Sequence, residues 1–161
     1  MDEIKTNAMR MLDAKQVPYT THRFPDDVHS AEDVAEAVGV PGEMVFKTLV
    51  VVSASQSDQA YLAMVPAHCQ LDLKKLARVA REKKLKMAGH DQAEEMTGLQ
   101  VGGISALALL NRGFRVFLDA SAQRFPEILV SAGQRGINLQ LPVSDLVRIV
   151  KARIADIARL L

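Results

Sequence analysis

The segment at residues 45–52 is almost wholly apolar and carries one charged side chain, Lys47. The β-branched run after Lys47 predicts a strand that is buried on both faces. A lysine ammonium at the end of such a strand is costly to desolvate unless it meets an anion or reaches a cleft. The alternative is a lysine at the strand edge, with its ammonium in water. Both interpretations stay open on this residue alone.

Short apolar segments separated by turn residues continue along the chain. Strand patterns are predicted at residues 19–24, 59–66, 85–87, 115–118, 128–131 and 137–141. Helical spacing predicts helices at 3–15, 30–39, 72–80, 91–98 and 142–151, and a further helical face from Ile154 to Leu161. The segment 59–66 is expected to be the hairpin partner of 45–52.

Hairpin-like pairs dominate this order, and strict alternation of strands and helices is absent. Such an order favours a mixed, mostly antiparallel sheet with helices packed outside it over a doubly wound parallel sheet. We therefore predict a single α+β domain over residues 1–161, with about six or seven strands in its central sheet.

Composition narrows the class of protein. Hydrophobic residues make up 48% and charged residues 24% of the chain, as in ordinary soluble proteins. The net charge of +1 provides no overall field for nucleic acid, so contact with a polyanion needs a local patch. Cys69 is the only cysteine, which favours an intracellular setting. With no apolar signal or membrane-spanning segment, a cytoplasmic protein without membrane contact is expected.

Two glycine-containing stretches are candidates for ligand contact. Gly102 and Gly103 can bring backbone N–H groups close to an anion or a polarised carbonyl, although an irregular connection is the commoner reason for such a pair. Ser131 stands at a strand end before Gly133 and Gly136, where it can place a hydroxyl in a pocket. A hairpin turn is the stronger interpretation of that stretch alone, and Ser131 lacks the sequence context of a serine nucleophile.

A basic stretch lies at residues 74–86. Lys74, Arg78 and Arg81 fall on one helix face, with Lys75 beside them. A solvated outer face is the commoner explanation, and contact with a phosphate backbone is the functional one.

Metal and cofactor signatures are weak. His22, His29, His68 and His90 show no ligand spacing with one another or with Cys69. No phosphate-binding loop or dinucleotide fingerprint occurs. No metal and no cofactor is therefore expected.

Taken together, five short segments resemble the YbaK family of bacterial aminoacyl-tRNA deacylases. These proteins are free-standing relatives of the editing domain inserted in bacterial prolyl-tRNA synthetase. Each segment is weak evidence alone, but the five occur in family order over nearly the whole chain. They are residues 45–50 (VFKTLV), 70–75 (QLDLKK), 97–105 (TG…GGIS), 130–136 (VSAGQRG) and 155–159 (ADIAR).

The resemblance implies a barrel-like central sheet and hydrolysis of an amino acid wrongly esterified to tRNA, typically cysteine on tRNA(Pro). It implies that Lys47 is the catalytic residue. It also implies that the substrate's own thiol attacks the ester, so that no protein nucleophile is needed. The expected partners are mischarged tRNA, with prolyl-tRNA synthetase as a further candidate, and a monomer or weak homodimer. The predicted substrate-binding residues are Phe24, Gly102, Gly103, Ile104, Ser105, Ser131, Gly133 and Asn138, and the predicted tRNA-binding residues are Lys74, Lys75, Arg78 and Arg81.

The chain departs from the family pattern at several positions. Ala106 and Ala108 stand where proline and glycine are usual, and Leu99 stands where tyrosine is usual. Phe24 replaces a tyrosine and Asn138 an aspartate of the cysteine-specific members. The changes at Ala106, Ala108 and Asn138 motivate the first of two alternatives that stay open beside a trans-editing deacylase. The first is a non-catalytic module that binds tRNA or a synthetase, and the second is a hydrolase of small amino esters.

Overall fold

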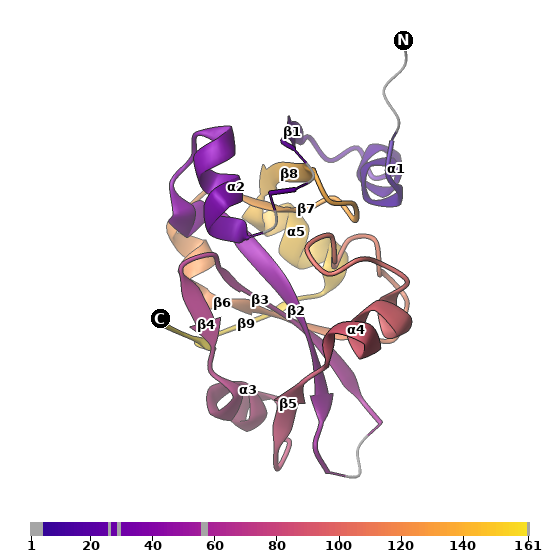
Figure 1. The fold of residues 1–161 in the computed structure, drawn as a ribbon, viewed down its shortest axis with the longest axis vertical. Helices are drawn as coiled ribbons and strands as arrows, with labels where there is room; N and C mark the ends of the chain where they lie inside the picture. The colour runs from indigo at the N-terminus through magenta and orange to yellow at the C-terminus, as the bar shows by residue number, and fades with distance from the viewer. Residues whose placement is uncertain (1–4, 26, 29, 56–57, 161) are drawn as a thin grey trace.

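The computed structural model describes residues 5–25, 27–28, 30–55 and 58–160, so expectations that fall on Ile4, His29 and Leu161 lie outside it. Its helices are α1 (Asn7–Ala14), α2 (Ala31–Val38), α3 (Leu73–Ala80), α4 (His90–Thr97) and α5 (Val143–Val150) (Figure 1). Its strands are β1 (Thr20–Arg23), β2 (Phe46–Ser53), β3 (Ala60–Pro66), β4 (Cys69–Leu71), β5 (Leu85–Met87), β6 (Arg115–Asp119), β7 (Glu127–Ser131), β8 (Ile137–Pro142), β9 (Arg153–Ala155) and β10 (Ala158–Leu160).

The α+β class is confirmed, with a mixed sheet at its centre. Five strands pair in the order β5-β2-β3-β6-β9. Strands β2 and β3 form the expected antiparallel hairpin, with Lys47 opposite Val65, whereas β6 runs parallel to β3 and β9. A separate sheet has the order β1-β8-β7, and β10 pairs with β4. The central sheet therefore has five strands where six or seven were expected, and the other described strands form two smaller sheets, so that the whole resembles a barrel only loosely.

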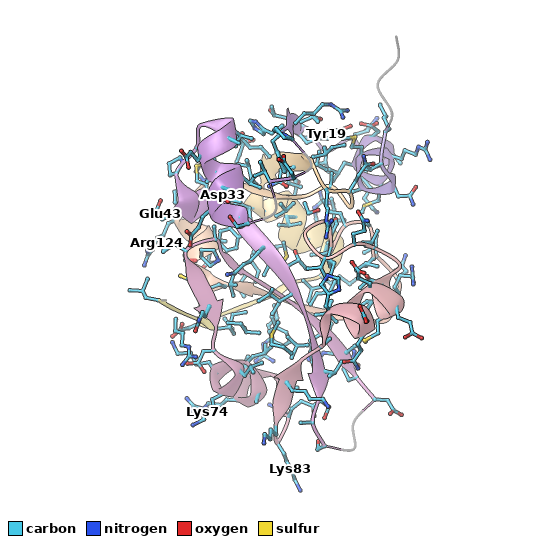
Figure 2. All side chains as sticks on the ribbon, in the orientation of Figure 1. Tyr19, Asp33, Glu43, Lys74, Lys83 and Arg124 are labelled. Atoms are coloured by element: carbon cyan, nitrogen blue, oxygen red, sulfur yellow. The ribbon has the colours of Figure 1, made fainter. Side chains whose placement is uncertain are left out.

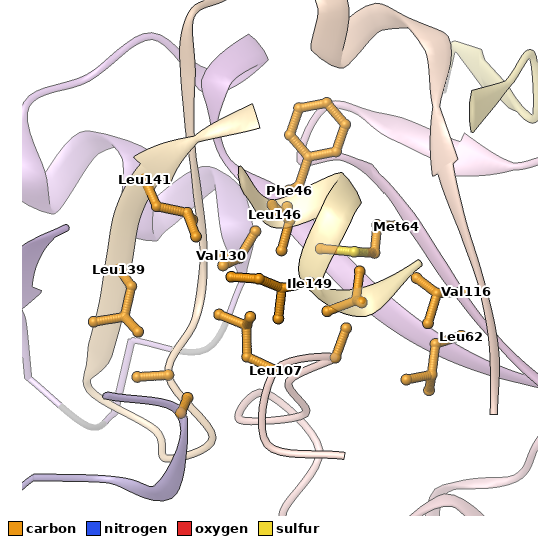
Figure 3. Packing of buried hydrophobic residues seen from close by; sticks show 14 of the residues in the cluster. Phe46, Leu62, Met64, Leu107, Val116, Val130, Leu139, Leu141, Leu146 and Ile149 are labelled. Atoms are coloured by element: carbon orange, nitrogen blue, oxygen red, sulfur yellow. The ribbon is translucent and has the colours of Figure 1, made fainter. Parts of the chain in front are cut away.

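Strand β2 is covered on two sides because its side chains alternate between two cores. Phe46 and Val50 join a large cluster with Met64 and residues of β7, β8 and α5 (Figure 3). Val51 lies on the other face, in a cluster with Leu76 of α3. Burial on both faces is thus confirmed for β2, with Lys47, Thr48 and Leu49 only partly buried.

The C-terminal segment corrects one expectation. The helical face predicted from Ile154 onward is instead two short strands, β9, which pairs with β6, and β10, which pairs with β4. The Asp119 carboxylate at the end of β6 accepts hydrogen bonds from the Ile157 and Ala158 N–H groups, each at 2.9 Å. These bonds hold the segment extended, because they satisfy backbone donors that a helix would direct to its own carbonyls.

Two helix starts also differ from expectation. Helix α4 begins after Gly89, whose N–H donates to Gln92, and Asp91 lies inside the first turn. Helix α1 begins after Thr6, whose hydroxyl accepts the Met9 N–H. Within the described ranges, every helix is too short or too polar to cross a membrane.

Candidate active site

A cavity of about 550 Å³ opens beside the first half of β2. It exists because β5 pairs with β2 only at Val51–Ser53, and the last contact is the Ala88 N–H donating to the Val50 carbonyl at 3.0 Å. The uncovered edge of β2 is enclosed instead by the start of α2, the start of α4, the loop at residues 101–104, and the ends of β7 and β8. Five predicted site residues line it together: Lys47, Gly102, Ile104, Ser131 and Asn138.

Lys47 is half-buried and lines this cavity, as the interpretation of a lysine that reaches a cleft predicts. Burial lowers the pKa of Lys47, and the negative charge of Glu32 across the cavity partly opposes that effect. Among the residues described, no carboxylate lies within 4.0 Å of the Lys47 ammonium. The ammonium is therefore held in a partly desolvated place without a close counter-ion, ready to meet negative charge on a ligand.

The structure favours glycine at positions 102 and 103 for two different reasons. Gly102 has φ +94°, a conformation that favours glycine. A side chain at Gly103 would begin 2.9 Å from the backbone nitrogen of Arg135, so close approach of two loops requires glycine there. The Gly103 N–H already donates to the Gln100 carbonyl at 2.8 Å. The Gly102 and Ile104 N–H groups have no acceptor in the described part of the chain, which leaves these two as donors for a ligand.

Ser131 and Asn138 are directly opposite one another in the β7–β8 pairing, which places both side chains on one face of the sheet. The Ser131 hydroxyl oxygen accepts the Gly133 N–H at 3.1 Å, and its own proton is free to be donated. Asn138 is 7% exposed, so its neutral amide lies deep in the wall.

Four predicted substrate-binding residues do not line the cavity. Ser105 is buried behind it, and its hydroxyl accepts the Ala108 N–H at 3.2 Å. Gly103 and Gly133 also lie behind the wall, and a side chain at Gly133 would begin 3.2 Å from the Ala108 methyl group. Phe24 packs against the small core under α2, with Val34 and Leu129. These residues shape the wall from outside the space that a ligand would fill.

The prediction of cavity residues from sequence missed several. Thr48 lines the cavity with a buried hydroxyl that has no partner among the described residues, and Glu32 and His90 stand at its wall. Arg135 also lines it, although its position in a G-x-x-G turn suggested only a hairpin. For Glu32 and Arg135 the sequence showed only a charged side chain, because these residues reach β2 through the tertiary fold and not through a local pattern.

His90 also belongs to a group that sequence spacing did not indicate. Its ring nitrogen, an Asp91 oxygen and a Glu94 oxygen lie within 4.8 Å of one another. His90 and Asp91 are exposed, and Glu94 accepts the Val101 N–H at 2.8 Å. Glu94 thereby holds the loop that encloses the cavity.

The predicted tRNA-binding residues lie elsewhere. Helix α3 packs against the opposite face of the five-stranded sheet through Leu76 and Ala77. Lys74 is at the end of the molecule away from Asp33 of α2 (Figure 2). Lys75 is engaged in an ion pair with Asp156 at 3.1 Å, whereas Lys74, Arg78 and Arg81 form no ion pair within the described ranges. None of the four lines the cavity.

A fold in which a half-buried lysine and a glycine-containing loop line one cavity can be compared with known proteins. The profile of the aminoacyl-tRNA editing domain family matches residues 25–149, and the chain belongs to this family. It is 37% identical over 155 residues to EbsC of Enterococcus faecalis, described as a candidate Cys-tRNA(Pro)/Cys-tRNA(Cys) deacylase. That match covers 95% of this chain and 93% of the relative.

Solved structures share the fold. The hypothetical protein APE2540 superposes with a TM-score of 0.86 at 19% identity, over 95% of this chain and 99% of the other. A candidate trans-editing enzyme for prolyl-tRNA synthetase superposes with a TM-score of 0.81 at 24% identity, over 98% of this chain and 99% of the other.

Proposed function

We propose that this protein is a trans-editing deacylase that hydrolyses a mischarged amino acid, with cysteine the first candidate, from tRNA(Pro). The observation that carries the proposal is the half-buried Lys47 ammonium, which lines a cavity of about 550 Å³ with the unpaired Gly102 and Ile104 N–H groups. The membership in the editing-domain family and the name of the E. faecalis relative support the same reaction.

The arrangement assigns separate tasks to its residues. Lys47 polarises the ester carbonyl, and the Gly102 and Ile104 N–H groups receive the negative charge that develops on its oxygen. The chemistry needs no nucleophile from the protein when the substrate's own thiol attacks the carbonyl carbon. The carbon–oxygen bond to the ribose then breaks, the ribose oxygen takes up the proton lost by the thiol, and water opens the resulting cyclic thioester to free cysteine. Cys69 fits that view, since it is buried outside the cavity and burial raises the pKa of its thiol.

The size of the cavity suits a second check on amino-acid identity. The binding free energies of similar small side chains differ by only about 1–3 kcal/mol, so synthetases need a second site that hydrolyses the wrongly charged products. Ser131 and Asn138 form the part of the wall that an amino-acid side chain or ammonium would meet. Because Asn138 is neutral, it offers the ammonium a carbonyl dipole in place of a charge.

The departures at Ala106 and Ala108 give little support to a non-catalytic module. Neither alanine has positive φ, so loss of glycine causes no backbone strain there. Ala106 is buried within the large core, which fixes the loop by packing.

We propose the cytoplasm as the setting, a single domain over residues 1–161, and a monomer or weak homodimer that prolyl-tRNA synthetase recruits. Sedimentation of the protein with and without the synthetase tests the assembly. The reaction is tested by incubating a panel of mischarged tRNAs, Cys-tRNA(Pro) and Ala-tRNA(Pro) first, with the wild type and Lys47→Ala. We expect release of amino acid by the wild type only. Retained tRNA binding without turnover of any species would favour the non-catalytic module.

A further inference from the structure

Arg135 is anchored in the cavity wall by the loop that carries Gly102. The Arg135 Nε donates a hydrogen bond to the Val101 carbonyl at 2.8 Å. A side chain at Gly102 would begin 3.4 Å from Nε and 3.7 Å from Cγ of Arg135, so the arginine stem lies across this glycine. The Nε edge of the guanidinium is thus fixed against the backbone. This also sets the direction of the remaining edge, which carries the two Nη groups.

The remaining edge has no partner among the residues that the structure describes. In residues 5–25, 27–28, 30–55 and 58–160, the two Nη groups donate to no acceptor and no carboxylate lies within 4.0 Å of them. Arg135 is only partly exposed, so water does not fully compensate this edge. A planar pair of N–H donors of this kind matches two oxygens of a carboxylate or a phosphate.

The substrate class decides between these two anions. Lys47 and Arg135 place two cations in the cavity wall, and Glu32 is the single acid there among the described residues. Cysteine or alanine esterified to RNA has no free carboxylate, and the positive charge of such an aminoacyl group is its ammonium. Arg135 therefore has no anionic partner in the amino acid. The nearest negative charge in such a substrate is the phosphodiester that joins the terminal nucleoside to the rest of the RNA.

We propose that Arg135 is a substrate-binding residue that holds this last phosphodiester through its two Nη groups. This inference rests on the proposed function, and it leaves Lys47 to polarise the ester. Because Arg135 Nε also fixes the Val101 carbonyl beside Gly102, phosphate binding and the position of the oxyanion donors are coupled. Binding energy from the phosphate is then used to align the reacting carbonyl.

The test compares two substrates that differ in this phosphodiester. One is a mischarged tRNA, and the other is the same amino acid esterified to adenosine, which keeps the ester and ribose but has no phosphate. We expect Arg135→Gln to raise KM for the tRNA by roughly 10- to 100-fold, as for loss of hydrogen bonds to a charged group. The glutamine Nε2 occupies the side-chain position of the arginine Nε and can keep the hydrogen bond to the Val101 carbonyl, so we expect kcat/KM for the adenosine ester to change less than about twofold. The slope of log KM against log salt for tRNA should fall by about one.

Arg124→Gln is the matched control, because Arg124 is an exposed arginine outside the cavity (Figure 2). Equal losses by Arg135→Gln on both substrates would overturn the phosphate role and leave only support of the loop. No loss on tRNA would overturn it as well. Affinity for a tRNA with a non-hydrolysable amide at its 3′ end separates this inference from the proposed function. Arg135→Gln should weaken that binding by the same factor even if the wild type hydrolyses none of the mischarged species.

Discussion

The cavity and the outer face of α3 both present positive charge, but they hold it in opposite ways. In the cavity, Lys47 and Arg135 are partly buried, and Arg135 is fixed by a backbone carbonyl at 2.8 Å. On α3, Lys74 and Arg78 project into water, and the pairing of Lys75 with Asp156 involves a carboxylate that is 75% exposed.

This difference sets what each region can do. A buried cation costs free energy to desolvate and recovers it only when a ligand or counter-ion arrives. An exposed cation costs almost nothing and acts through a screened field. We therefore expect removal of one charge from the cavity to alter the proposed chemistry, and removal of several from α3 to be needed for a marked change in affinity for RNA.

The largest effect is expected for Lys47→Ala. Removing the group that polarises the ester should lower the single-turnover rate of mischarged tRNA by about 10²–10³-fold, in line with the loss of one stabilising donor in a hydrolase. Affinity for uncharged tRNA should change little, because the ammonium is placed at the ester and not at the phosphates. Lys47→Arg keeps the charge and should retain part of the rate. A Lys47→Ala rate equal to that of the wild type would remove the distinction between the two regions.

The pH dependence gives a second test of the buried ammonium. Burial lowers the pKa of Lys47 below 10.5, so the deacylation rate should decline as pH rises through that lowered pKa. The folded state binds this proton less well than the unfolded state, so Lys47 makes stability rise with pH in the interval between the lowered pKa and 10.5. Once spontaneous ester hydrolysis is subtracted, Lys47→Arg should shift this alkaline decline in rate, the alkaline limb of the pH profile, to higher pH. An unchanged limb in that variant would assign it to another group.

A third test separates stability from chemistry on the α3 side. Burial acts to raise the pKa of Asp119, but hydrogen bonds from Ser121, Ile157 and Ala158 outweigh it and lower that pKa. Asp119→Ala should reduce the free energy of unfolding by about 2–4 kcal/mol, since buried backbone donors lose their acceptor. The contribution of Asp119 is present above pH 3.8 and is lost as pH falls through the lowered pKa.

Urea unfolding at neutral pH measures this effect, with Asp156→Asn as the matched control on the same segment. Asp156 is exposed and paired only with Lys75, so its removal should cost no more than about 1 kcal/mol. The deacylation rate of folded Asp119→Ala should equal that of the wild type. Equal unfolding curves for the two variants would contradict the role of Asp119 in holding the C-terminal strands.

The same contrast explains what the sequence made predictable. Strands such as β2 and β3 carry their burial in their own side chains, so local patterns located them. The segment from Ile154 to Ala158 has helical spacing, yet Asp119, nearly forty residues away, binds its backbone and makes it extended. Arg135 was missed for a similar reason, because its task depends on the approach of Gly102 and Gly103 to the β7–β8 turn. Lys47 was singled out as a candidate because a lone charge in an apolar strand is a local signal, whereas its catalytic role was inferred from the family resemblance.

The smallest effect is expected on α3, for Lys74→Gln combined with Arg78→Gln and Arg81→Gln. Lys74 and Arg78 are exposed on α3, and Arg81 lies just beyond it as the left-handed C-cap rather than on the predicted helix face. Loss of these exposed cations should weaken tRNA binding about two- to fivefold at low salt. The loss should vanish at high salt, and the single-turnover rate at saturating protein should be unchanged. Lys75→Gln, which removes an already paired cation, should have less effect than any of the three. Filter binding across a salt series measures these values, and a triple variant that lowers the saturated rate as much as Lys47→Ala would show that α3 takes part in the chemistry itself.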